Sequence, residues 1–161
     1  AKLSDLLKKH QPDALFISEV RMPAAAPAGA KVGDGKPRRH SALATTSKSA
    51  REEAELILSF VRSHGYKAYW SLCEKKYAGT ALLVRTCCIQ PRALRFNLDL
   101  CAPASEHDKD GRVILATFDS FELLGQYVPN NGTSADSFAR RRHWDKQVET
   151  FLLARQAQKA G

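Results

Sequence analysis

Polar side chains follow two apolar stretches that have the composition of buried strands. In PDALFISEVRMP, Glu19 and Arg21 come directly after the apolar run. In QYVPNNGT, Tyr127 and Asn130 stand in the corresponding place. Loops at strand ends are held by a rigid scaffold, so binding and catalytic side chains often lie there. Both strand ends are therefore candidates for a site.

Glu19 needs a partner, because an unpaired carboxylate at the end of a buried strand costs free energy. Side chains alternate along a strand, which puts Arg21 on the same face, so a purely structural ion pair is one interpretation. The other is a hard cation such as Mg²⁺, which takes oxygen ligands and often only one or two carboxylates. The residues alone leave both interpretations open.

The second strand end offers an O–H group from Tyr127 and an amide from Asn130 to an anion. An ordinary transition from a strand to a loop, with no function, has the same composition and is the alternative interpretation. Two other places carry groups suited to nucleic acid: Tyr69 precedes Trp70 at a predicted strand end, and Arg112 enters a strand from a polar loop. Aromatic and arginine side chains together can clamp a nucleic acid, although each residue alone is more typical of packing or solvent contact.

Composition places the chain among soluble globular proteins. Its 161 residues suffice for one domain, with 43% hydrophobic and 26% charged residues. No stretch is long and apolar enough to cross a bilayer, and no signal peptide is recognisable. The net charge of +8 and the pI of about 9.5 favour a polyanionic partner, with a solvated basic surface as the plain alternative.

The cysteines do not have the spacing of a zinc site. We expect reduced thiols in an intracellular protein, and no zinc, from Cys73, Cys87, Cys88 and Cys101.

Hydrophobic periodicity and turn residues predict a mixture of helices and strands, which argues for an α/β or α+β domain around a packed sheet. The expected elements are a helix over residues 2–10, a strand over 14–20, a helix from the capping box Ser49–Glu52 to Gly65, strands in YKAYWSL and GTALLVR, a buried β-hairpin over 112–128 that turns at Asp119-Ser120, and a helix over 134–159. The expected apolar faces of the two long helices consist of Ala50, Ala54, Ile57, Leu58 and Val61, and of Phe138, Trp144, Val148, Phe151 and Leu152. We interpret two irregular segments, at about residues 22–48 and 86–104, as loop insertions within a single domain.

Four stretches, PDALFISEVRM, GYKAYWSLCEKKYAGTALLVR, SEHDKDGRVILATFDSFELLGQYVPNNG and RRRHWDKQVETFL, occur in this order. They resemble the exonuclease III family of apurinic/apyrimidinic (AP) endonucleases, within the endonuclease/exonuclease/phosphatase superfamily. The resemblance implies a four-layered α/β sandwich with two mixed sheets between helices. It also implies base-excision repair: Mg²⁺-dependent hydrolysis, with Mn²⁺ as an alternative, of the phosphodiester bond 5′ to an abasic site in double-stranded DNA. A 3′–5′ exonuclease or 3′-phosphodiesterase activity can accompany it. We expect a monomer, intracellular and in the nucleus or an organelle.

The resemblance also implies roles for residues. Glu19 matches the family's metal-binding glutamate, and Arg21 falls where the family has a basic residue beside it. Tyr127 matches a tyrosine at the scissile phosphate, and Asn130 an asparagine that faces the same phosphate.

Two further positions match residues that grip DNA on either side of the lesion, Tyr69 and Arg112. Thr133 stands where close relatives often have a basic residue.

The chain differs from the family because three of the family's sequence segments are not found in it. The family's N-G/D-G, G-D-x-N and S-D-H segments are absent, and His107 and His143 are in the wrong context to replace its catalytic histidine. We therefore expect only the N-terminal-to-middle part of the sandwich, and no activity from the isolated chain. Two alternatives stay open. One is a non-catalytic DNA-binding fragment or degenerate copy. The other is a related phosphoesterase acting on phospholipids or inositol phosphates.

Overall fold

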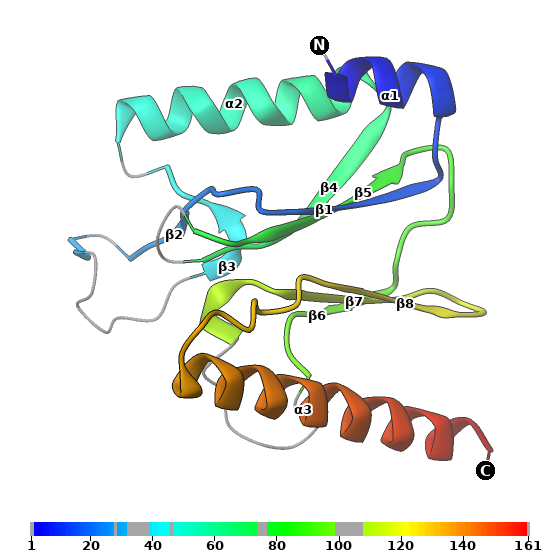
Figure 1. The fold of residues 1–161 in the computed structure, drawn as a ribbon. Coiled ribbons are helices and arrows are strands. Elements are labelled where there is room, and N and C mark those ends of the chain that lie inside the picture. Colours follow the sequence, from blue (N-terminus) through cyan, green and yellow to red (C-terminus); the bar gives the residue numbers. More distant parts are fainter. Residues whose placement is uncertain are drawn as a thin grey trace.

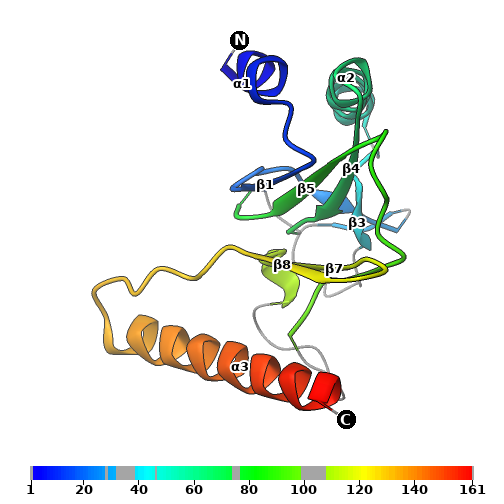
Figure 2. The same cartoon turned by 90° about the vertical axis from the view of Figure 1, so that its right-hand side faces the viewer.

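The computed structural model describes residues 2–27, 29–31, 39–45, 47–73, 77–98 and 108–160. They form four layers (Figure 1). Helices α1 (Lys2–His10) and α2 (Lys48–Ser63) cover one side, two three-stranded sheets lie in the middle, and α3 (Ala135–Ala160) covers the other side. Figure 2 shows the same stack from the side. The predicted helix–sheet–sheet–helix sandwich is confirmed.

The first sheet has the order β1-β5-β4, with β1 over Ala14–Ser18, β5 over Thr80–Arg85 and β4 over Tyr66–Ser71. The central strand β5 is buried along almost its whole length, whereas the edge strand β1 is only half-buried. Side chains alternate across β5, so Leu82 and Val84 face the second sheet while Leu83 packs with the helices.

The second sheet has the order β6-β7-β8, with β6 over Ala93–Arg95, β7 over Val113–Thr117 and β8 over Glu122–Gln126. The predicted hairpin is confirmed, with the Phe118 amide donating to the Phe121 carbonyl across its turn. Only β7 is buried; β8 is half-buried because it lies at the edge. The pairs within both sheets are antiparallel, whereas the resemblance implied mixed sheets.

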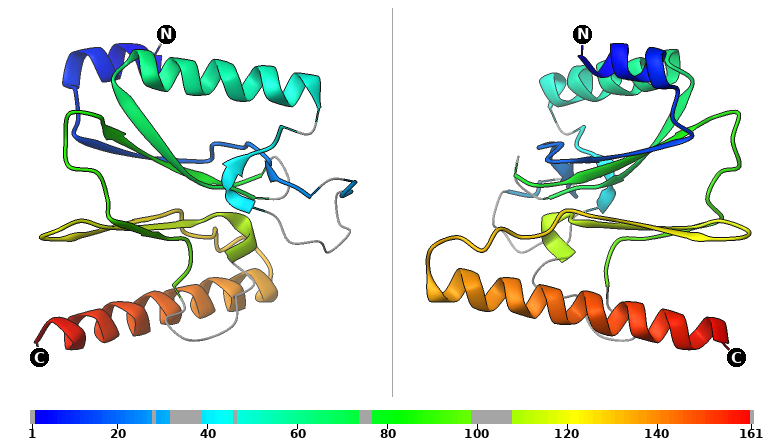
Figure 3. Two further views of the ribbon diagram at one scale, coloured as in Figure 1. Left: turned by 180° about the vertical axis from the view of Figure 1, so that it is seen from behind. Right: turned by 45° about the vertical axis from the view of Figure 1, so that its right-hand side comes forward.

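The two sheets pack face to face through large apolar side chains. Leu82 and Val84 of β5 meet Ile114 and Ala116 of β7 in one buried cluster. The stacked sheets are also seen from behind in Figure 3.

Helix α3 packs on the second sheet through fewer residues than expected. Trp144 and Phe151 are buried against Val113 and Leu115 of β7. Two predicted members of this face lie outside it, because they project away from the sheet: Phe138 is 42% and Leu152 49% exposed.

Helix α2 begins two residues earlier than expected. Its N-cap is Ser47, whose hydroxyl oxygen accepts a hydrogen bond from the Ala50 amide at 3.1 Å, so the predicted Ser49–Glu52 box is wrong. Its C-terminal end is confirmed, since Gly65 takes a positive φ of 79° directly after the C-cap residue His64. Ala54 and Val61 are buried on the predicted face, whereas Leu58 is exposed.

The segment predicted as an irregular insertion at about residues 22–48 contains two short strands. Strands β2 (Ala24–Ala25) and β3 (Arg39–Leu43) pair with each other. Met22, Ala24 and Leu43 are buried with Trp70, so this part of the segment belongs to the core. Strand β6 likewise lies within the predicted insertion at 86–104. Residues 28, 32–38, 46 and 99–107 lie outside the described ranges.

Within the described part of the chain, none of the helices has the length and apolar character that a membrane crossing requires. Cys73, Cys87 and Cys88 form no disulfide, and Cys101 lies outside the described residues.

Gly125 of β8 provides a test of the sheet-to-sheet packing. A Cβ added at Gly125 would lie 2.2 Å from Cδ2 of Phe16 on β1. Gly125→Ala should therefore lower the free energy of unfolding by about 1–3 kcal/mol through overpacking, measured by urea denaturation. The double variant Gly125→Ala/Phe16→Leu should lose less than the sum of the two single losses. Strict additivity would contradict the close contact.

Candidate functional site

Glu19 lies beyond the end of β1 rather than within the strand. The strand stops at Ser18, and both Glu19 and Arg21 adopt a positive φ, of 56° and 52°. The Val20 amide donates to the Gly79 carbonyl at 3.1 Å and the Arg21 amide to the Ala78 carbonyl at 3.0 Å. Left-handed backbone is uncommon outside glycine and is held here by these hydrogen bonds.

This local backbone corrects two expectations. The strand does not continue to Val20, and Glu19 is not buried: its side chain is 44% and that of Arg21 66% exposed. The two side chains nevertheless meet, because Arg21 Nη2 donates to Glu19 Oε2 at 2.8 Å. The ion pair that the sequence left open is therefore present.

The two predicted strand ends come together across the two sheets. The hydroxyl of Tyr127, the residue directly after β8, donates a hydrogen bond to Glu19 Oε1. One carboxylate thus contacts a guanidinium through one oxygen and a phenol through the other.

Arg112 holds Tyr127 in place. The Tyr127 amide donates to the Arg112 carbonyl at 2.8 Å, and Arg112 Nη1 donates to the Tyr127 carbonyl at 3.3 Å. The Arg112 guanidinium also lies over two aromatic rings, with Cζ 5.1 Å from the Tyr127 centroid and 5.9 Å from the Tyr77 centroid.

The guanidinium of Arg112 is buried, with its side chain only 5% exposed, and Nε donates to Asp110 Oδ2 at 3.0 Å. A buried charge needs such a partner. The resemblance implied that Arg112 grips DNA. The structure places Arg112 beneath the site, where it supports Tyr127, and its contact with DNA stays a prediction.

The Asp-Gly-Arg sequence before β7 has a clear packing reason. Gly111 has a positive φ of 64°, and a Cβ there would lie 2.4 Å from the Ser71 carbonyl oxygen. The Thr80 hydroxyl donates to the Gly111 carbonyl at 3.0 Å, and the Gly79 amide donates to the Asp110 carbonyl at 3.1 Å. This close approach joins the start of the second sheet to the end of the first sheet that carries Glu19.

Asn130 lies three positions beyond Tyr127 and is exposed. Its Oδ1 accepts a hydrogen bond from the Gly132 amide at 3.4 Å, so the oxygen faces its own loop. The side-chain nitrogen is then the atom available to an anion.

Tyr69 is not brought to the Glu19 site. Its partly buried ring packs against the apolar cluster between the sheets, and its hydroxyl donates to Gln90 Oε1 at 3.0 Å. Gln90 in turn donates to the Arg85 carbonyl, which is at the opposite end of β5 from Thr80. The DNA contact by Tyr69 stays a prediction, and it would lie away from Glu19.

The sequence reasoning missed Tyr77 and Asp110, which surround Arg112. The stretch DKDGRV contains a signal for Asp110, since an acidic residue two positions before an arginine at a strand start can pair with it.

The contact between Glu19 and Tyr127 shifts the pKa values of the two groups in opposite directions. The hydrogen bond from Tyr127, followed by that from Arg21, lowers the pKa of Glu19. The hydrogen bond to Glu19 and then burial raise the pKa of Tyr127. Near neutral pH the carboxylate is therefore ionised and the phenol keeps its proton.

The sign of the resulting pH dependence follows from linkage. The lowered pKa of Glu19 contributes stability above the unfolded-state value, and this is lost as pH falls through the folded-state value. The raised pKa of Tyr127 contributes stability below its unfolded-state value, and this is lost as pH rises through the folded-state value.

The site offers a hard cation one carboxylate, that of Glu19. Among the described residues there is no group of three or more His, Cys, Asp or Glu side chains able to hold a metal. Glu19 alone is compatible with Mg²⁺, which keeps several waters and often uses one or two carboxylates.

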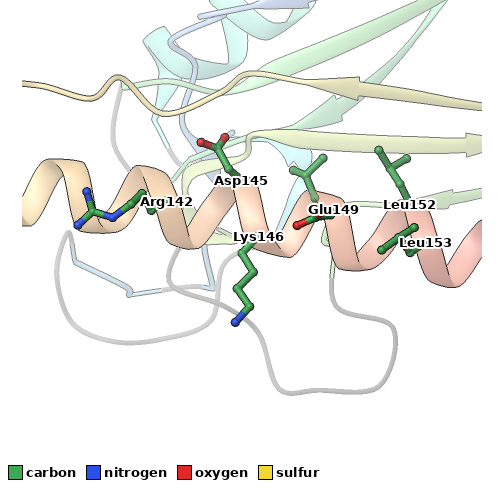
Figure 4. A pocket seen from close by; sticks show the side chains of 7 residues that line it. Arg142, Asp145, Lys146, Glu149, Leu152 and Leu153 are labelled. Carbon is green, nitrogen blue, oxygen red and sulfur yellow. The ribbon is translucent and has the colours of Figure 1, made fainter.

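A hollow of about 820 Å³ lies elsewhere, along α3 between Arg142 and Leu153 (Figure 4). It contains none of the residues that surround Glu19.

Comparison with known proteins shows which proteins this chain resembles. No family model matches the chain. A protein of Arabidopsis thaliana named DNA-(apurinic or apyrimidinic site) endonuclease is 45% identical over 157 residues, which cover 94% of this chain and 41% of that protein. A Plasmodium berghei (strain Anka) protein with the same name is 30% identical over 155 residues, covering 88% of this chain and 28% of that protein. The chain is thus similar to proteins named AP endonucleases over almost its whole length. It spans less than half the length of these AP endonucleases.

A solved structure supports the fold of this chain. The 3′ phosphatase NExo from Neisseria, bound to a product DNA hairpin, superposes with a TM-score of 0.64 at 18% identity. The match covers 97% of this chain and 47% of that chain.

The hydrogen bond between Glu19 and Tyr127 can be tested by titration. Tyr127→Phe should raise the pKa of the Glu19 carboxyl in the metal-free protein, because it removes the strongest lowering influence. Arg21→Met should raise that pKa by less. Carbon-detected NMR titration measures both, with the Asp13 carboxyl at the other end of β1 as an internal control. A larger rise in the Arg21 variant would contradict the assigned order.

Proposed function

We propose that the protein containing this chain hydrolyses the phosphodiester bond 5′ to an abasic site in double-stranded DNA, with Mg²⁺ bound at Glu19. The main support is the contact between Glu19 and Tyr127, which brings two strand ends together in one exposed site. The sequence relationship to proteins named AP endonucleases supports the choice of DNA as substrate. The net charge of +8 favours a polyanion.

Each side chain has a chemical role under this proposal. Glu19 stays ionised and offers oxygen to the cation. A divalent cation bound there would neutralise charge on the phosphate and the leaving oxygen. Tyr127 keeps its proton, and by turning its hydroxyl from Glu19 to the substrate it can donate a hydrogen bond to a phosphate oxygen. The amide nitrogen of Asn130 can donate to the same group. Arg21 presents an exposed positive charge beside them.

Binding would involve an abasic nucleotide turned out of the duplex, which costs less than extruding a paired one. We propose a monomer that acts in base-excision repair in the nucleus or an organelle, with Mn²⁺ able to replace Mg²⁺. The sandwich alone would also suit a phosphoesterase acting on phospholipids or inositol phosphates, but the named relatives favour DNA.

The metal role of Glu19 predicts a change in metal requirement. In the full-length protein, Glu19→Gln should raise the Mg²⁺ concentration for half-maximal nicking of abasic duplex DNA by at least about 10-fold, because a charged ligand is lost. Asp13→Asn is the matched control, since it removes a carboxylate from the other end of β1, where Asp13 pairs with Arg85. Equal nicking by wild type and Glu19→Gln at limiting Mg²⁺ would exclude the metal role.

The role of Tyr127 predicts a separation of rate from affinity. Tyr127→Phe should lower kcat on abasic DNA by roughly 100-fold while the Kd for that DNA changes much less, since a donor to the transition state is removed. Single-turnover kinetics and binding without Mg²⁺ measure the two effects. Tyr66→Phe is the control, because it removes a hydroxyl that donates to the Pro12 carbonyl far from the site. A loss confined to affinity would make Tyr127 a DNA-positioning residue instead.

A further inference from the structure

The loop that carries Tyr127 and Asn130 is tied to helix α3 by one arginine. Arg141 lies in the second turn of α3, and its Nη1 donates to the Pro129 carbonyl at 3.3 Å. Pro129 stands between the two functional side chains in sequence and is buried. This hydrogen bond therefore reaches the backbone at the middle of the candidate site.

Asp145 orients the arginine. One turn further along α3, its two carboxylate oxygens accept hydrogen bonds from Arg141 Nε at 2.8 and 3.0 Å. These two hydrogen bonds to Nε fix the plane of the guanidinium, so that Nη1 is directed at the loop. The Arg141 side chain is 33% exposed, so packing covers most of it. An ion pair this accessible adds little stability, which makes geometry its main effect.

Both ends of the same loop are also held. At its start, the Tyr127 amide donates to the Arg112 carbonyl. At its end, the Ser134 amide donates to Ser137 Oγ at 3.1 Å and the Ser137 amide donates to Ser134 Oγ at 3.2 Å. Gly132, with φ of 61°, packs so closely that a Cβ would lie 2.6 Å from Ser137 Oγ. Arg141 thus acts on a segment whose ends are already placed.

We propose that Arg141, oriented by Asp145, is a positioning residue that sets where the Tyr127 hydroxyl and the Asn130 amide lie relative to Glu19. This inference rests on the proposed nuclease function. Its competitor is a direct contact between the Arg141 guanidinium and a DNA phosphate. The two roles make different demands on the side chain at position 141. Positioning requires the planar, two-point geometry of arginine, whereas a phosphate contact requires only positive charge.

The kinetic experiment uses the full-length protein, abasic duplex DNA and Mg²⁺. Arg141→Ala and Arg141→Lys should both lower kcat by about 10- to 100-fold, because the misplacement of reacting groups by an ångström has effects of this size. KM and the slope of log KM against log salt concentration should stay close to wild type. Arg140→Ala removes the same charge one position away on the exposed face and should leave kcat unchanged.

Hydrogen exchange provides a second readout that does not need activity. Loss of the hydrogen bond to Pro129 should speed amide exchange at Val128 and over residues 130–133 by about 5- to 10-fold in Arg141→Ala, and less in Asp145→Asn. Arg140→Ala should exchange as wild type does. If the wild-type protein proves inactive on abasic DNA, the proposed function fails, and the exchange data still decide whether Arg141 holds the loop.

Several outcomes would overturn the inference. Rescue of kcat by Arg141→Lys, or a salt slope reduced by about one with a raised KM, would assign Arg141 to a DNA phosphate. Unchanged exchange at residues 130–133 would show that Arg141 does not hold the loop. Faster exchange with wild-type kcat would show that the loop position does not matter for the reaction.

Discussion

The face-to-face packing of the two sheets is the constraint on which the site depends. Leu82 and Val84 of β5 meet Ile114 and Ala116 of β7, and these buried side chains set the distance between the sheets. Glu19 belongs to the end of one sheet and Tyr127 to the end of the other. Their contact therefore exists because the apolar core holds the two ends at the right separation.

A second connection fixes the ends themselves. Gly111 lets the chain pass close to the Ser71 backbone, and Arg112 follows it with a buried guanidinium beneath Tyr127. The β7–β8 hairpin is thereby anchored to the sheet that carries Glu19. A charge that would be costly in an apolar core is satisfied here by Asp110 and by two aromatic rings, and it stiffens the floor of the site.

Sequence reasoning recovered the elements whose patterns are long and regular. The helix over Lys2–His10, the strand pairs and the final helix were confirmed because apolar periodicity and turn residues agree there. Sequence reasoning failed where only the three-dimensional geometry distinguishes between similar residues. Ser47 and Ser49 are both acceptable caps on paper, and β2 is too short and rich in small residues to show alternation.

The candidate site followed the same division. Residue type and position were enough to single out Glu19 and Tyr127, whose side chains the structure brings into contact, and Arg21, which pairs with Glu19. They could not indicate that the Arg112 guanidinium is buried beneath Tyr127, because burial depends on the packing of distant strands. The positive φ of Glu19 is likewise set by hydrogen bonds to the segment before β5. Arg141 looks the same as its neighbours Arg140 and Arg142 in sequence, and only its contacts distinguish it.

The sequence separation of the partners of Glu19 has a consequence for how the site forms. Arg21 is two positions away, whereas Tyr127 is 108 positions away. As the chain leaves the ribosome, the ion pair can form almost at once, but the phenol arrives only after both sheets have been synthesised and have docked. The tyrosine contact is thus a late, non-local event. A chain with unfinished sheet packing would carry the charged pair without the hydroxyl, so the complete site arises together with the core.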